Sequence, residues 1–182
     1  MKVVLDVAIK ASPKEAQAAL LEPAFYQSLG QLGAIAAPEV RSISRTNKSA
    51  HLVLHYRFAG QLNGIARSML DPDKLTWVQE TEVDLARLRT QVRMVPDNYE
   101  QLISFNGWYE LRRSEGRKCT QHFEADLRVH LPLVGPLAER AITSSIRDNV
   151  VSTAKVLERY LAARGRRLGA TAGNPRPRTG NA

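Results

Sequence analysis

Alternating apolar and polar positions near the N-terminus predict a first strand. The apolar positions are Val3, Leu5, Val7 and Ile9. This period of two is typical of a strand with one buried face. The motif Ser12-Pro13-x-Glu15 then supplies an N-cap, a proline at the first helical position and an early acid, which together start a helix. Because Pro23 interrupts the helical pattern, we predict two short helices, the second ending near Gly30 or Gly33.

The next segment predicts two strands, over residues 39–46 and 50–59, joined by a polar turn through Asn47 and Lys48. In the second strand four apolar positions share one face and should point inward. These are Leu52, Leu54, Tyr56 and Phe58. Residues 61–70 have no clear pattern, and a single helical turn is one reading of them.

Two hairpins follow, and their side chains suggest a register for each. A turn at Leu85 and Ala86 would place Trp77, Thr81 and Val83 opposite Met94, Thr90 and Leu88. The turn lacks the Asn-Gly expected of a two-residue hairpin, so a bulge is the alternative. A second turn at 114–116, with Gly116 left-handed, would place Phe105, Gly107, Tyr109 and Leu111 opposite Ala125, Phe123, Gln121 and Cys119.

A long helix is predicted from about Pro136 to Ala163. Its apolar residues recur every three or four positions, which indicates one buried face. They are Ala138, Ile142, Ile146, Val150, Thr153, Leu157 and Leu161. At about 1.5 Å per residue the helix is roughly 40 Å long, enough to cross a whole sheet.

Composition limits the number of domains and the location of the protein. The 182 residues suit one domain, here 1–163. The formal charge is +8, but five arginines and no acid follow residue 163, so the body carries only +3. We expect residues 164–182 to be a disordered basic tail, with weak contact to an anionic membrane as the alternative, and no specific nucleic-acid partner. No apolar run is long enough to span a membrane, which favours a cytoplasmic protein. The single Cys119 is expected in the core.

The order of these elements resembles the START-like, or SRPBCC, helix-grip superfamily. The resemblance covers residues 1–163 and rests on VVLDVAIKASPKEA near the start and PLVGPLAERAITSSIRDNVVSTAKVLERYLA near the end. Within the superfamily the chain is most similar to a bacterial family of uncharacterised function. The resemblance implies an α+β fold in which a curved sheet of about seven strands encloses the last helix and a cavity for lipids, sterols, polyketides or plant hormones. It implies no catalytic motif, and a fold alone does not determine function.

The predicted inner surface is apolar with a few neutral polar groups, which suits an apolar ligand. Its ligand-binding residues would be Leu54, Tyr56, Phe58, Trp77, Gln79, Phe105, Tyr109, Gln121, Phe123, Ile142 and Ile146. Gln79 and Gln121 would orient the ligand through hydrogen bonds, although they could equally satisfy each other or a buried water. No catalytic residue, metal or cofactor is predicted.

Several other residues are interpreted as surface features. His51 and His55 lie about 13 Å apart on a strand, too far to share a metal. Trp108 beside His122 is either a contact for a partner or a pair packed under a loop. The row of Arg87, Arg89 and Arg93 indicates ion pairs with nearby acids rather than a phosphate site.

Three functions therefore stay open at this point. The first is a non-catalytic carrier or sensor of an apolar small molecule. The second is a cyclase or dehydratase for a polyketide-like substrate, with Tyr109 as the acid, although no inward carboxylate or histidine would assist it. The third is an interaction module whose interior is filled by side chains.

Overall fold

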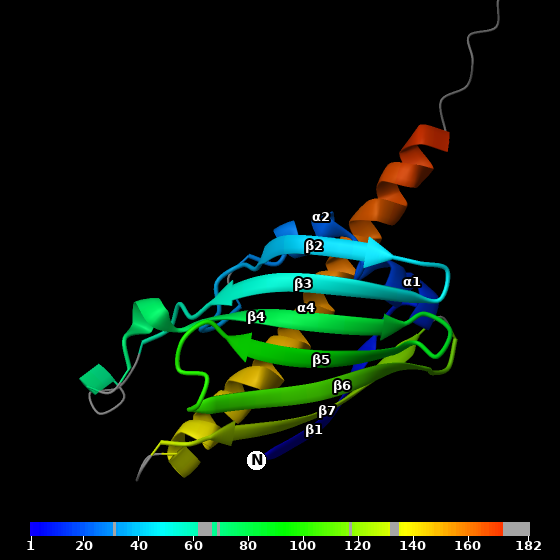
Figure 1. Ribbon diagram of the computed structural model, residues 1–182. Helices are drawn as coiled ribbons and strands as arrows, with labels where there is room; N and C mark the ends of the chain where they lie inside the picture. The colour runs from blue at the N-terminus through cyan, green and yellow to red at the C-terminus, as the bar shows by residue number, and fades with distance from the viewer. Residues whose placement is uncertain (31, 62–66, 69, 117, 132–134, 173–182) are drawn as a thin grey trace, which may run out of the picture.

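The computed structural model describes residues 1–182 except 31, 62–66, 69, 117, 132–134 and 173–182. The described residues form one curved sheet, two short α-helices, a short 3-10 helix and one long α-helix (Figure 1). In chain order the elements are β1 (Lys2–Ile9), α1 (Pro13–Ala19), α2 (Pro23–Gln27), β2 (Glu39–Arg45), β3 (Ser49–Arg57), the short 3-10 helix η1 (Pro72–Lys74), β4 (Thr76–Asp84), β5 (Arg89–Pro96), β6 (Ile103–Arg113), β7 (Cys119–Val129) and α4 (Gly135–Ala172).

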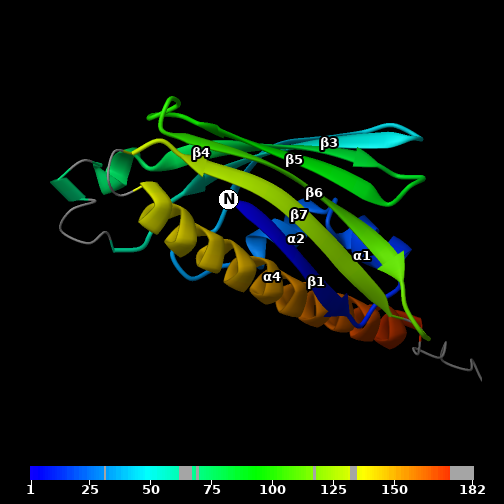
Figure 2. The ribbon, with the colours of Figure 1, turned by 90° about the horizontal axis from the view of Figure 1, so that it is seen from below.

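The seven described strands belong to a single antiparallel sheet in the order β1-β7-β6-β5-β4-β3-β2. The sheet curves, and α4 runs along its concave side (Figure 2). The helix packs mainly against β1 and β7, while α1 and α2 lie over the same side of the sheet. This arrangement confirms the predicted α+β helix-grip fold.

The capping motif forms as the sequence predicts. The backbone N–H of Glu15 donates to Ser12 Oγ over 3.3 Å, and the Ser12 N–H donates to a carboxylate oxygen of Glu15 over 3.0 Å. Pro23 begins α2. Gly30 and Gly33, with φ of 61° and 57°, follow this helix in the left-handed region, where a glycine costs little. The two short helices are therefore confirmed.

The first hairpin register is wrong by two residues. Thr81 lies opposite Val92 and Val83 opposite Thr90, because the turn spans four residues, Leu85 to Leu88. Asp84 Oδ1 stabilises this turn by accepting hydrogen bonds from the backbone N–H groups of Ala86 and Arg87, over 3.0 and 2.9 Å. A shift of two residues preserves the faces, so every inward residue predicted on these strands still points inward.

The second hairpin is also shifted by two residues. Its turn is closed by the Ser114 N–H, which donates to the Lys118 carbonyl over 3.0 Å, with Gly116 at a φ of 69° between them. The turn thus sits one position later than predicted. As a result Phe105, Gly107, Tyr109 and Leu111 pair with Leu127, Ala125, Phe123 and Gln121.

The long helix continues past its predicted end at Ala163 to Ala172. Arg164, which the sequence assigned to the tail, lies in the helix and forms an ion pair with Glu22. Tyr160 also donates from its hydroxyl to Glu22, over 2.6 Å. Glu22, just before α2, therefore links the N-terminal helices to the last part of α4. Residues 173–182 lie outside the described residues, so the disorder predicted for the tail stays a prediction.

Candidate functional site

The concave face of the sheet is almost entirely uncharged. In the pairing register, the inward positions of β1, β3–β5 and β7 carry apolar or neutral polar side chains. Among the described strand residues, only Arg45 and Arg113 are charged and fall on this side, and both are exposed at strand ends. The face can therefore hold an apolar molecule without desolvating a charge.

One end of this face is closed. Leu52, Leu54 and Val83 are each at most 4% exposed. They form one apolar cluster with residues of α1, α2 and the middle of α4, including Ala16, Phe25 and Leu157. The two short helices thus fill the concave side at this end.

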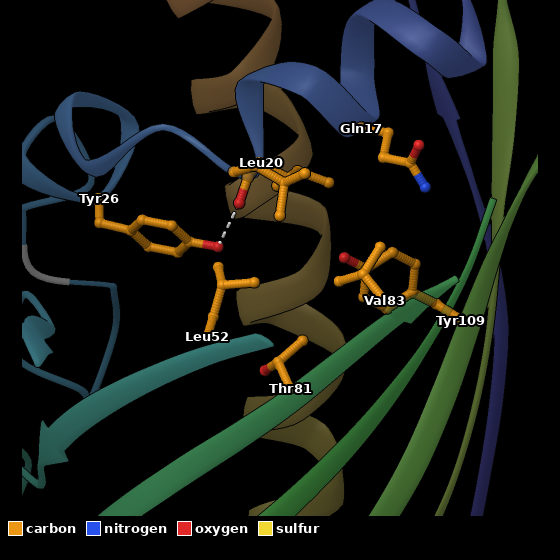
Figure 3. Close-up of a pocket in the computed structure, with 8 residues that line it drawn as sticks. Gln17, Leu20, Tyr26, Leu52, Thr81, Val83 and Tyr109 are labelled. Atoms are coloured by element: carbon orange, nitrogen blue, oxygen red, sulfur yellow. Dashed lines mark hydrogen bonds between the residues drawn. The ribbon is translucent and has the colours of Figure 1, made fainter. Parts of the chain in front are cut away.

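A small cavity of about 10 Å³ remains within the closed end (Figure 3). Gln17, Leu20, Leu21, Tyr26, Leu52, Thr81, Val83 and Tyr109 line it. The Tyr26 hydroxyl donates to the Leu20 carbonyl over 2.7 Å, as the dashed line in Figure 3 marks. A space of this size holds about one water molecule, so a larger ligand needs a different part of the face.

Further along the strands, the inward side chains of the described residues are less completely buried. Neighbouring strands there present inward side chains that are only half-buried. They are Tyr56, Trp77, Gln79, Met94 and Phe105. Ile142 and Ile146 of α4 are also half-buried and pack with Phe105. We call these seven residues the open end.

Two aromatic rings at the open end are stacked. The ring centroids of Tyr56 and Trp77 lie 5.6 Å apart, with an angle of 9° between the ring planes. Stacked rings form a broad flat apolar wall with few rotamers to immobilise when a ligand binds. Beside them, the Gln79 side-chain amide donates to Thr81 Oγ1 over 3.4 Å, a long and therefore weak hydrogen bond. Gln79 can thus exchange this partner for a ligand at little cost.

The predicted ligand-binding residues fall into different places. Tyr56, Trp77, Gln79, Phe105, Ile142 and Ile146 lie at the open end, whereas Leu54 and Phe123 are buried in the core. Phe58 lies beyond the end of β3, with its ring against Gly60. Tyr109 lines the small cavity. The predicted ligand role of all of these residues stays a prediction.

The two predicted polar anchors lie far apart on the concave face. Gln79 is on β4 and Gln121 on β7, three strands away, which is roughly 14 Å across the sheet alone. Gln121 pairs in register with Leu111 and Val7, away from the open end. A small ligand could therefore contact one of these glutamines but not both.

Three tyrosines on the inner side of the sheet remain in their neutral form at physiological pH. Burial raises the pKa of Tyr26, Tyr56 and Tyr109, and at Tyr109 a hydrogen bond with Thr90 partly offsets that rise. A raised pKa makes a phenol a weaker acid at neutral pH. Tyr109 is thus poorly suited to the acid role in the cyclase hypothesis.

Sequence reasoning missed Asn149 on α4. Its side-chain Nδ2 is buried and is the one such atom without a hydrogen-bond partner in the part of the chain that is described. Its Oδ1 lies 3.5 Å from the point where a Cβ on Gly33 would stand. Asn149 follows Ile146 by three positions and so lies close to the apolar stripe. This spacing is the signal in the sequence that places Asn149 beside the stripe.

The outer face of the sheet carries paired charges, as predicted for the arginine row. Arg87 pairs with Asp84 at 3.7 Å and Arg93 with Glu80 at 4.0 Å. The exception is Arg89, whose guanidinium lies 3.8 Å from the centroid of the Trp108 ring. Trp108 also contacts the His122 ring at 5.4 Å. It borders an open hollow of about 230 Å³ on this face.

The histidines of β3 interact with acids. His55 Nε2 lies 2.8 Å from Asp97 Oδ2, and His51 Nε2 lies 3.5 Å from Glu82 Oε1. Within the described residues, no three His, Cys, Asp or Glu side chains are grouped to hold a metal ion. The buried Cys119 has its pKa raised to about 11 by burial, which makes its thiol unreactive at neutral pH.

Comparison with known proteins identifies the family. Residues 5–161 match the model of a family described as a protein of unknown function, DUF2505. The chain belongs to this family. No curated protein sequence matches the chain.

Solved structures confirm the fold of this DUF2505 protein. A crystal structure of TTHA0849 from Thermus thermophilus is 18% identical, with a TM-score of 0.64 and coverage of 90% of this chain and 99% of that one. The Zhui aromatase/cyclase from a Streptomyces species is 15% identical, with a TM-score of 0.62 over 96% and 99% of the two chains. Norcoclaurine synthase from Thalictrum flavum is 14% identical, with a TM-score of 0.60 over 89% and 86%. Identities this low establish the helix-grip fold alone.

The described helices include none that is long and apolar enough to cross a membrane.

Proposed function

We propose that this DUF2505 protein is a non-catalytic carrier or sensor of an apolar small molecule, which binds at the open end. The observation that carries the proposal is that the burial of side chains differs along the concave face. Leu52, Leu54 and Val83 are buried by α1, α2 and α4, whereas Tyr56, Trp77 and Phe105 keep solvent-exposed area on the same face. Aromatic side chains left half-exposed in a concave surface gain stability when an apolar ligand covers them.

The polar groups at this site would determine orientation. Gln79 can donate or accept a hydrogen bond to a ligand carbonyl or hydroxyl, and its present bond to Thr81 is long. The uncharged walls favour a neutral ligand, or an amphipathic one whose charged group remains in solvent. Fold relatives named as an aromatase/cyclase and a norcoclaurine synthase support a small-molecule site in this fold.

The cyclase alternative receives less support from the residues. General acid–base catalysis needs a positioned acid or base with a suitable pKa. Among the described strand residues, the two charged side chains on the concave side are Arg45 and Arg113, both exposed at strand ends, and burial raises the pKa of Tyr109. The interaction-module alternative rests on the filled closed end and predicts that no ligand binds.

The two tryptophans allow a direct test because they lie on opposite faces of the sheet. Trp77 points inward at the open end, and Trp108 lies on the outer face over Arg89. In Trp108→Phe, Trp77 is the sole tryptophan, and in Trp77→Phe only Trp108 remains. A brominated fatty acid should quench the tryptophan fluorescence of Trp108→Phe strongly, and the quenching should reach saturation. It should quench the fluorescence of Trp77→Phe only weakly.

Native mass spectrometry of protein purified from its own host complements the titration. A retained mass of lipid size supports the carrier. Equal quenching of the fluorescence of the two variants would mean that the fatty acid binds elsewhere. A protein that retains no ligand mass, and whose fluorescence is quenched in neither variant, would favour the interaction module.

A further inference from the structure

The face of α4 that points away from the sheet carries a row of cations. With about 100° between successive residues, Arg140, Arg147, Lys155, Arg159 and Arg166 fall within one third of the helix circumference. This sector lies opposite the stripe that contains Ile142, Ile146 and Leu157. All five cations are exposed. We call them the α4 basic row.

Within the described structure, none of these five side chains forms an ion pair or a hydrogen bond with another residue. The outer face of the sheet differs, because Lys2, Arg87 and Arg93 there each lie within 4.0 Å of a carboxylate. Two acids share the sector with the α4 basic row. Asp148 is exposed, and Glu158 accepts a hydrogen bond from the Lys10 N–H over 2.8 Å. The sector therefore has a net charge of +3, five cations less two acids.

An exposed apolar residue lies at the start of the same sector. Leu137 is 61% exposed, the more exposed of the two large hydrophobic side chains that stand out on the described surface. It is three positions before Arg140, so both side chains project to the same side of the helix. From Leu137 to Arg166 the sector is roughly 44 Å long. Figure 2 shows α4 along one side of the molecule, with the sheet and the short helices on the other side of the helix.

We infer that the α4 basic row binds the surface of an anionic lipid membrane, with Leu137 inserted at the level of the headgroups. An anionic membrane attracts a linear array of basic residues, and an apolar side chain beside the array adds hydrophobic binding. Such a surface lies on the opposite side of α4 from the proposed ligand site. This inference goes beyond the proposed function, because it depends on no ligand in the open end.

The test compares two triple charge reversals that change the net charge equally. The first, Arg147→Glu with Lys155→Glu and Arg159→Glu, alters the α4 basic row. The second, Lys48→Glu with Arg57→Glu and Lys118→Glu, alters exposed cations on or beside strands β3 and β7. Each lowers the formal charge from +8 to +2. Binding is measured by sedimentation of the full chain with mixed vesicles of phosphatidylcholine and phosphatidylserine, the second being the anionic lipid that gives the surface its negative potential.

The first variant should lose affinity by at least roughly a hundredfold, from about fivefold for each cation removed. The second variant should bind within a few fold of wild type. Leu137→Gln should weaken binding without altering the charge, and vesicles of phosphatidylcholine alone should bind none of the proteins. Unchanged melting temperatures of the variants show that exposed substitutions have left the fold intact.

Three results would overturn the inference. Equal losses in the two triple variants would mean that net charge rather than this surface determines binding. A loss confined to Arg176→Gln with Arg178→Gln would assign binding to the tail. Stronger retention on duplex DNA than on vesicles at equal salt would identify a nucleic acid as the partner of the row.

Discussion

Leu157→Ala tests whether α4 stabilises the sheet. Leu157 is 1% exposed and belongs to the cluster that joins α4 to α1, α2 and β3. Replacing a buried leucine by alanine costs about 2–5 kcal/mol, because apolar contacts are lost and a cavity remains. For a domain of this size each kcal/mol lowers the melting temperature by about 2–4 °C. A cost of about 3 kcal/mol therefore predicts a decrease of roughly 6–12 °C.

The matched control is Arg159→Ala, two positions further along the same helix but exposed. It should change the melting temperature by no more than about 2 °C, since surface substitutions typically alter stability by less than about 0.5 kcal/mol. Both variants are measured by circular dichroism during heating and by urea unfolding. If Leu157→Ala melts at the same temperature as Arg159→Ala, the packing of α4 on the sheet described above is incorrect.

Three further perturbations follow from individual contacts. Glu22→Gln removes the carboxylate that interacts with Tyr160 and Arg164. The unfolding free energy should decrease by about 0.5–1.5 kcal/mol in low salt and by less in high salt. An equal decrease at both salt concentrations would contradict the ion pair. Gly107→Ala should lower the melting temperature because its Cβ would lie 2.9 Å from the Glu124 carbonyl oxygen, whereas Gly165→Ala, with open space in helix α4, should raise it. Burial raises the pKa of Cys119 to about 11 and also raises the pKa of Tyr56. At alkaline pH the folded protein therefore retains protons that the unfolded chain releases. The unfolding free energy should be constant up to about pH 9 and fall above it. Urea unfolding from pH 7 to 11 checks this, and stability that rises above pH 9 would refute it.

The faces of the strands could be predicted from the sequence, but the registers could not. Alternation of apolar and polar residues reports which side of a strand is buried, and this is the same in any register that differs by two. The exact partner of Thr81 depends on the turn, where the Asp84 carboxylate binds the N–H groups of Ala86 and Arg87. No apolar pattern encodes that contact.

The division of the concave face into a closed and an open end was also beyond sequence reasoning. It depends on how far α1 and α2 reach over β3 and β4, which is a contact between segments distant along the chain. Phe25 illustrates this, since it is fully buried and its ring contacts Tyr160 at 5.7 Å. Likewise, the end of α4 could not be located from the helical pattern, because Glu22 interacts with Arg164 across 142 positions.

The corrected register explains why α4 packs where it does. Gly107 lies opposite Ala125, whereas the predicted register would have placed it opposite Phe123. A Cβ at Gly107 would come within 2.9 Å of the Ala125 Cβ, so these two small residues mark a shallow point in the concave face. Ile146 and Val150 of α4 pack against the cluster that contains Ala125 and Val3. Phe105 and Tyr109, the inward residues on either side of Gly107 along β6, pack against the same cluster. A phenylalanine opposite Gly107 would occupy the space in which α4 packs. The helix would then lie in a different position relative to Phe105 and the rest of the open end.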